Sequence, residues 1–99
     1  MVQVKWTSQA KADLKDIADY ISIDSVKYAK FQVNKIIAIT KVLKSHSRIG
    51  KVVNEFDNQD IREWVYGNYR IIYKLISLKR IDIVAIHHSA RDLTKRNIH

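Results

Sequence analysis

The stretch of sequence that decides the fold is Ile61–Leu93, IREWVYGNYRIIYKLISLKRIDIVAIHHSARDL. Its first half has the two-residue step Gly67-Asn68 between runs rich in Val, Trp, Tyr and Ile. This step predicts a tight β-hairpin, because glycine readily adopts the positive φ of such a turn. Successive side chains of a strand point to opposite faces, so the hairpin has one aromatic and aliphatic face and one charged face. The predicted cross-strand pairs are Tyr66 with Tyr69, Val65 with Arg70, Trp64 with Ile71, Glu63 with Ile72, Arg62 with Tyr73 and Ile61 with Lys74.

A second turn near Ser77-Leu78-Lys79 leads into a third strand, and its length determines which histidine joins which face. An even-length loop would place Asp82 among aromatic and aliphatic side chains, where an unpaired carboxylate costs several kcal/mol. We therefore expect a loop of three residues, with Lys74 facing Asp82 and Arg70 facing Ile86, a register that a β-bulge would reverse. The charged face then holds Glu63, Arg70, Lys74 and His88, and the apolar face gains Ile81, Ile83 and Ala85.

The composition narrows the class of protein. The 99 residues suffice for a single hydrophobic core, so we expect one domain over residues 1–99. The absence of cysteine excludes disulfides, thiol chemistry and cysteine-ligated zinc. No apolar run reaches the roughly 20 residues of a membrane span and no signal-peptide pattern opens the chain, so we expect a cytoplasmic protein without membrane contact. The formal net charge of +8 indicates a polyanionic target, an acidic protein partner, or both.

The first half of the chain predicts a short strand and two helices. Residues 2–6 alternate as a strand does, and Thr7 or Ser8 can cap a helix that ends at about Ile23. A second cap at Asp24-Ser25 opens a helix to about Lys44, and the short link makes the two helices antiparallel. The predicted fold is therefore α+β: an N-terminal strand, then an antiparallel helix hairpin packed on a twisted, mainly antiparallel sheet. The remaining segments are a short strand or extended loop at residues 51–56, a turn at residues 57–60 and a basic tail at residues 91–99.

Several kinds of enzyme are excluded by missing motifs. The chain has too little glycine for a phosphate-binding loop and has no HExxH helix. His87 and His88 are adjacent on a strand and point to opposite faces, so we expect neither a metal site nor a cofactor. Ser77 and Ser89 lack the strand-turn-helix context of a nucleophilic serine.

The best candidates for chemistry are Arg70, His88 and Arg91. Arginine can neutralise a phosphodiester and the extra charge of its transition state, and a histidine that titrates near neutrality can act as general acid or base. In the alternative interpretation Arg70 pairs with Glu63 on the sheet and His88 satisfies local hydrogen bonds. Further cations that could hold phosphates or contact a target are Lys51, Arg62, Lys74, Lys95 and Arg96.

A combination of short motifs spans nearly the whole chain. They are Trp6-Thr7-Ser8-Gln9-Ala10, Asp13-Leu14, Ile17, Tyr20-Ile21, Gly50-Lys51-Val52-Val53, Ile61-Arg62-Glu63, Gly67-Asn68-Tyr69-Arg70-Ile71-Ile72-Tyr73-Lys74 and His88-Ser89-Ala90-Arg91-Asp92-Leu93. Together with the order strand, helix hairpin, antiparallel strands, this combination resembles the RelE/ParE superfamily of type II toxin–antitoxin toxins. The resemblance implies a small toxin that a cognate antitoxin wraps and silences in a toxin–antitoxin hetero-oligomer.

The resemblance implies two alternative mechanisms. ParE-like members inhibit DNA gyrase and stabilise plasmids, with no established chemistry of their own. RelE-like members enter the ribosomal A site and cleave mRNA by making the 2′-OH attack the adjacent phosphate. Arg70 matches the strand arginine of these nucleases and His88 lies where some of them place a histidine, so Arg70, His88 and Arg91 are catalytic only in the second mechanism.

Two departures favour the ParE-like branch. Between Arg48 and Arg62 the only cation is Lys51, where ribosome-dependent nucleases have a dense Lys/Arg cluster, and no tyrosine follows Arg91. We therefore expect a gyrase inhibitor. A ribosome-dependent mRNA endoribonuclease is the alternative, and a basic binding module without toxicity is a third interpretation.

Overall fold

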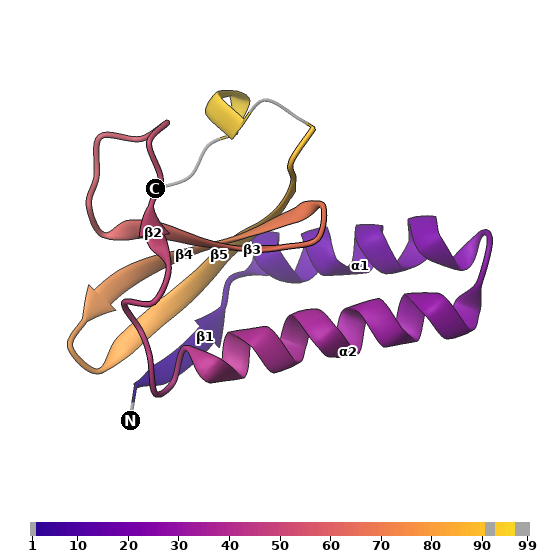
Figure 1. Ribbon diagram of the computed structural model, residues 1–99, viewed down its shortest axis with the longest axis horizontal. Helices are drawn as coiled ribbons and strands as arrows, with labels where there is room; N and C mark the ends of the chain where they lie inside the picture. The colour runs from indigo at the N-terminus through magenta and orange to yellow at the C-terminus, as the bar shows by residue number, and fades with distance from the viewer. Residues whose placement is uncertain (1, 91–92, 97–99) are drawn as a thin grey trace.

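The computed structural model describes residues 2–90 and 93–96. Its elements are β1 (Gln3–Trp6), α1 (Ser8–Ser22), α2 (Val26–Val42), β2 (Lys51–Val52), β3 (Ile61–Tyr66), β4 (Tyr69–Ser77), β5 (Arg80–His88) and the short 3-10 helix η1 (Leu93–Lys95). The helix pair lies on one side of the sheet, and the connection after β2 lies with η1 on the other side (Figure 1). The α+β fold expected from the sequence is confirmed.

Both helices begin at the predicted caps. The Thr7 side chain accepts a hydrogen bond from the backbone N–H of Ala10 at 3.1 Å, and Ser25 does the same for Tyr28 at 3.0 Å. Thr7 Oγ1 also donates to the carbonyl of Ile83 at 3.0 Å, which ties the start of α1 to β5. The two helices are antiparallel and extend beyond the sheet (Figure 1). Within the part of the chain that the structure describes, neither is long and apolar enough to cross a membrane.

The sheet has the strand order β1-β5-β4-β3-β2. β1 pairs with β5 in parallel, and the other neighbours are antiparallel. The β3–β4 hairpin turns at Gly67, whose φ of 56° provides the predicted left-handed conformation. All the cross-strand pairs predicted for this hairpin are present, from Tyr66 opposite Tyr69 to Ile61 opposite Lys74.

The predicted register of β4 and β5 is correct only in the middle of the ladder, from Tyr73 to Leu75. At the turn, Ser77 pairs with Arg80 where Ile76 was expected to face it, so the connection is the two residues 78–79 and not the predicted loop of three. Lys74 pairs with Asp82 as expected, but the register shifts between Ile72 and Tyr73, where Val84 of β5 has no partner. One extra residue in a strand is a β-bulge, and it exchanges the faces of every later side chain. Arg70 consequently pairs with His87 instead of facing Ile86, and His88 pairs with Tyr69.

Each face of the sheet has its own hydrophobic cluster. The face toward the helices packs the larger one, which we call the helix-side core: Ala10, Ile36, Leu43, Ile71, Tyr73, Leu75, Ile81, Ile83 and Ile86. The opposite face carries a smaller cluster, which we call the loop-side core: Val53, Ile61, Ile72, Ala85 and Leu93. Ala85 was predicted on the helix side, and the bulge at Val84 moves it to the loop side.

Gly50 allows the loop before β2 to lie against the sheet. A Cβ there would be 2.5 Å from the Tyr73 hydroxyl and 2.6 Å from the backbone carbonyl of Glu63, so no larger residue fits. The Gly50 N–H donates to the Tyr73 hydroxyl at 2.9 Å. Burial raises the pKa of Tyr73, which keeps this hydroxyl neutral in its place.

Candidate functional site

Arg70 lies on the loop side of the sheet and is held by two carboxylates. Its Nε donates to Glu63 Oε2 at 3.0 Å, its Nη1 donates to Glu55 Oε2 at 2.6 Å, and its Nη2 contacts both carboxylates. These hydrogen bonds lower the pKa of Glu55 and raise that of Arg70. The Arg70 side chain is 15% exposed and that of Glu63 only 5%. Because two anions compensate one guanidinium, Arg70 offers little net charge to a phosphate. The pairing of Arg70 with Glu63, the alternative interpretation of the sequence, is confirmed.

The two histidines of β5 lie on opposite faces. His87 is buried on the loop side as the partner of Arg70 in the β4–β5 ladder, and Arg96 Nη1 is 3.4 Å from its Nδ1. His88 lies on the helix side, with its ring edge-on to Tyr69 at a centroid separation of 5.5 Å and an interplanar angle of 88°. The Ala90 N–H donates to His88 Nδ1 at 3.1 Å, so this nitrogen carries no proton in the observed geometry.

The prediction that Arg70 and His88 share a face is therefore wrong. The bulge at Val84 turns His88 to the helix side and brings His87 to the face that Arg70 occupies. Arg91, the third member of the predicted catalytic group, lies outside the described residues. A general base and a phosphate-binding arginine must reach the same phosphodiester, and the sheet separates these two candidates.

The other predicted cations do not form one surface. Lys51 and Lys74 are on the loop side with Arg70, and Lys51 Nζ is 3.9 Å from Glu63 Oε1. Arg62 is on the helix side, where its Nη1 donates to the carbonyl of Gly50 at 2.9 Å and braces the loop before β2. Lys95 is exposed on η1. Arg62 and Lys51 thus have partners within the fold, which the sequence alone could not show.

An ion pair that the sequence reasoning missed joins Asp13 of α1 to Arg96, the residue that follows η1. Asp13 Oδ2 accepts from the backbone N–H of Ile86 at 2.9 Å and from Arg96 Nη2 at 2.6 Å, while Gln9 donates to Asp13 Oδ1 at 2.9 Å. β1 ends at Trp6, so the later part of β5 has no strand beside it at this edge, and Asp13 supplies the missing acceptor. Arg96, which was predicted to bind phosphate or a target, forms this intramolecular ion pair with Asp13.

One sequence signal does mark Asp13. It lies three residues after Ala10 and four before Ile17, within the apolar stripe of α1, where an acid is out of place unless it has a buried partner.

A cleft of about 560 Å³ opens beside this ion pair, between α1 and the end of β5. Tyr20, Tyr69 and His88 provide aromatic walls, and burial raises the pKa of Tyr69. Arg96 is paired with Asp13 within this lining, and Asp16 adds a second carboxylate, so the described lining offers no free cation to an anionic ligand. Among residues 2–90 and 93–96, no group of three or more His, Cys, Asp or Glu side chains could hold a metal ion.

Comparison with known proteins decides the family. Residues 4–93 match the family model described as the ParE toxin of the type II toxin–antitoxin system parDE. This chain belongs to the ParE toxin family. The predicted RelE/ParE resemblance and its ParE-like branch are thereby confirmed.

A solved structure agrees with this ParE assignment. The chromosomal ParDE toxin–antitoxin system from P. aeruginosa contains a chain that superposes with a TM-score of 0.71 and 24% sequence identity. The match covers 89% of this chain and 96% of that one, and at this identity it shows the shared fold. No curated protein sequence matches the chain significantly.

Proposed function

We propose that this ParE-family chain is the toxin of a type II toxin–antitoxin module and that it inhibits DNA gyrase by binding. The observation that carries the proposal is the state of Arg70, whose guanidinium is neutralised by Glu55 and Glu63 and separated by the sheet from His88. A transesterifying nuclease needs an available cation beside a proton acceptor. Membership of the ParE family over residues 4–93 supports the same conclusion.

The proposed partner in the resting cell is an acidic antitoxin. A chain with a net charge of +8 attracts an anionic protein at long range and gains from charge neutralisation on binding. The structural neighbour is described as a toxin–antitoxin system, which supports a hetero-oligomer here too. Gyrase acts in the cytoplasm, so the proposed location is cytoplasmic and the proposed role is plasmid or locus stabilisation.

The test compares the two possible targets directly. Purified chain is added to gyrase with supercoiled DNA, and separately to a translation reaction whose mRNA ends are mapped. We expect an increase in gyrase-linked DNA breaks and no new cuts within ribosome-bound codons. Such mRNA cuts without a gyrase effect would establish the endoribonuclease alternative, and silence in both assays would favour a non-toxic binding module.

Two substitutions sharpen this test. His88→Gln removes the imidazole from the helix side, and the amide should leave gyrase inhibition within about twofold of the parent because no proton transfer is required. Lys95→Ala removes an exposed cation of η1 and should weaken inhibition if the tail region contacts the target. Circular dichroism and a thermal melt check that both variants fold.

A further inference from the structure

The outer surface of α2 carries two exposed aromatic rings side by side. Tyr28 and Phe31, which we call the aromatic pair, are 51% and 50% exposed. Their ring centroids are 6.2 Å apart, and the interplanar angle is 19°. One exposed aromatic side chain on a surface needs no explanation. Two nearly parallel rings, however, offer planar ligands adjacent surfaces on which to stack.

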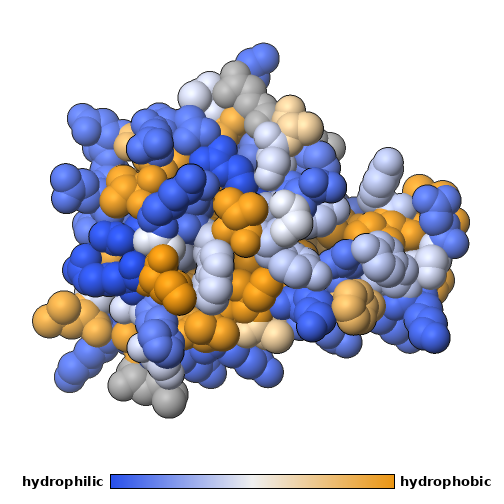
Figure 2. Space-filling model, viewed as in Figure 1, coloured by the Kyte–Doolittle hydropathy of each residue, from blue (hydrophilic) through white to orange (hydrophobic). Residues whose placement is uncertain are grey.

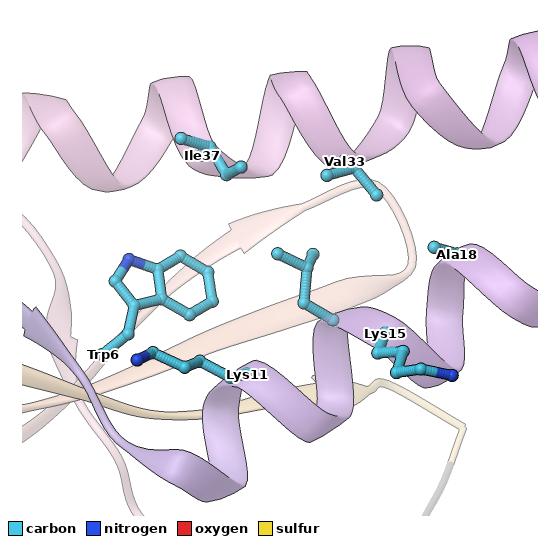
Figure 3. Close-up of a pocket in the computed structure, with 7 residues that line it drawn as sticks. Trp6, Lys11, Lys15, Ala18, Val33 and Ile37 are labelled. Atoms are coloured by element: carbon cyan, nitrogen blue, oxygen red, sulfur yellow. The ribbon is translucent and has the colours of Figure 1, made fainter.

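The aromatic pair lies away from the packed faces of α2. At about 100° per residue, Phe31 is roughly 160° around the helix from Val33. Val33 and Ile37 point toward α1 across an apolar hollow (Figure 3), and Ile36 is buried in the helix-side core. Figure 2 shows hydrophobic and hydrophilic side chains interspersed on the part of the helix pair that extends beyond the sheet. The aromatic pair is therefore available to a ligand from solvent.

Hydrogen bonds that begin on the sheet hold Tyr28 in place. The Tyr66 hydroxyl, at the end of β3, donates to Gln32 Oε1 at 2.9 Å. Gln32 Nε2 in turn donates to the Tyr28 hydroxyl at 2.6 Å. These contacts restrict the rotamers of an exposed side chain, so a ligand that stacks on Tyr28 immobilises less free side-chain motion when it binds.

Lysines accompany the aromatic pair. Lys35 Nζ lies over the Phe31 ring, 5.5 Å from its centroid, and Lys27 is exposed beside Tyr28. The whole of α2, Val26–Val42, contains four lysines and no Asp or Glu. None of these lysines forms an ion pair with any residue in the described ranges 2–90 and 93–96. The surface around the rings therefore carries positive charge that an anionic ligand can neutralise.

We propose that the aromatic pair and its lysines bind single-stranded nucleic acid. Unpaired bases stack on the rings of Tyr28 and Phe31, and phosphates meet the ammonium groups of Lys27 and Lys35. Every base has a planar face, so binding by stacking carries little sequence preference. This inference goes beyond the proposed function and does not depend on it, because neither kind of contact involves gyrase.

The same features disfavour other occupants. A double helix presents phosphates to the lysines but keeps its bases inside the stack, so the aromatic pair would stay without a partner. Two copies of this chain facing each other through α2 would oppose lysines to lysines, with no carboxylate from α2 to compensate them. A helix that binds a lipid surface needs a wide apolar face, whereas Gln32 and Lys35 adjoin these two rings.

The test measures fluorescence anisotropy of a labelled oligothymidine of about 15 nucleotides, a length within the range of single-strand binding sites. Two labelled polyanions without accessible bases are the comparison probes: a DNA duplex of the same length and an oligoglutamate with the charge of the single strand. The duplex has the higher charge, so attraction of charge alone would favour it. We expect saturable binding of oligothymidine, about fivefold tighter than that of either comparison probe.

Substitution of one ring separates stacking from charge. Phe31→Leu keeps an apolar side chain but removes the ring, and it should weaken oligothymidine binding about tenfold while leaving oligoglutamate binding unchanged. Phe31→Tyr should retain binding. The matched control is Tyr20→Leu, which removes a ring that is 75% exposed on α1 and should change binding by less than about twofold. Thermal melts check that each variant folds.

Substitution of one lysine tests the phosphate contact. Lys35→Gln should weaken oligothymidine binding about threefold and reduce the dependence of affinity on salt concentration. Lys11→Gln is the matched control, because it gives the same net charge but removes a lysine of α1, and it should weaken binding by clearly less.

Three outcomes would overturn the proposal. One is binding of the duplex as tight as that of the single strand, which would show attraction of charge alone. A second is equal weakening by Phe31→Leu and Tyr20→Leu, and a third is tighter binding of oligoglutamate, which would indicate an acidic protein partner for this surface. None of these readouts uses gyrase. A chain that binds oligothymidine as expected but has no effect on gyrase would therefore contradict the proposed function and leave this inference intact.

Discussion

The two faces of the sheet bury their side chains in different ways. On the helix side, two long amphipathic helices cover a large cluster that includes Ile71 and Ile83. On the loop side, a smaller cluster around Ile72 is covered by the connection after β2 and by η1, and a network of Arg70 with two carboxylates lies beside it. The comparison shows that the loop side of the sheet is also a packing surface. It is covered by a loop and by ion pairs of Arg70, whereas the helix side is covered by two helices.

This difference bears on function. Sequence reasoning treated the loop side as an open cationic surface for a substrate, but its principal arginine is bound within the molecule. Within residues 2–90 and 93–96, Lys11 and Lys30 of the helix hairpin line open hollows and have no ion pair. Binding to partners is thus better supported than chemistry on the sheet.

The largest expected effect is a difference between two neighbouring core residues. Ile71→Ala should destabilise the protein by about 4 kcal/mol and Ile72→Ala by about 2 kcal/mol, because the rigid helix pair cannot close over the cavity whereas the loop can. Both side chains are fully buried, so burial alone predicts equal losses. Urea unfolding of the two variants measures the difference, and equal or reversed losses would contradict the contrast between the faces.

The next effect concerns the charge network on the loop side. Arg70→Gln leaves Glu63 buried without its main cation and should destabilise the protein by about 3 kcal/mol at neutral pH. Adding Glu63→Gln should restore more than half of the loss, since no buried charge then remains unpaired. Lys51→Gln is the control, because its ammonium is 3.9 Å from Glu63 and mostly exposed, and it should change stability little. A double variant no more stable than Arg70→Gln would show that the arginine acts by packing alone.

A smaller loss of stability is expected at the edge of β5, where Asp13 links α1 to Arg96. Asp13→Ala removes the acceptor of the Ile86 N–H and the partner of Arg96, and should cost about 2 kcal/mol. Amide hydrogen exchange should accelerate at Ile86 and in η1 before it accelerates in β4. Gln9→Ala, which removes a more exposed neighbour of the same carboxylate, is the matched control and should have a minor effect.

The smallest effect is a pH dependence. Hydrogen bonds from Arg70 lower the pKa of Glu55 below the value of about 4.3 expected in an unfolded chain. The carboxylate therefore contributes stability above that pH, and the contribution is lost as the pH falls through the lowered pKa. Acid titration of the unfolding midpoint should show a shallower decline for Glu55→Gln than for the parent chain. Identical declines of the unfolding midpoint in the two proteins would show that the Glu55 carboxylate does not contribute to stability.

Local signals in the sequence predicted most of the fold. The β3–β4 hairpin follows from Gly67 and the flanking alternation, and the helices follow from the caps at Thr7 and Ser25 and from apolar periodicity. These features depend on residues close to one another in the chain. The hairpin and both helices could therefore be predicted without knowledge of the tertiary structure.

The arrangement of the site depended on contacts that are distant in the sequence. The bulge at Val84 occurs where β1 has ended and Thr7 Oγ1 lies 3.4 Å from the Val84 carbonyl, a contact across most of the chain. Nothing near Glu55 in the sequence indicates that the loop after β2 folds back onto Arg70. One inserted residue and one folded loop were enough to separate the predicted catalytic pair and to neutralise its arginine.

The most direct test of the separated faces is a measurement of nuclear Overhauser effects from the two histidine rings in solution. We expect His88 ring protons to show effects to the Tyr69 ring, and His87 to show them to loop-side residues such as Ala85. Effects between the His88 ring and the Arg70 side chain would contradict the observed register and would restore a shared catalytic face.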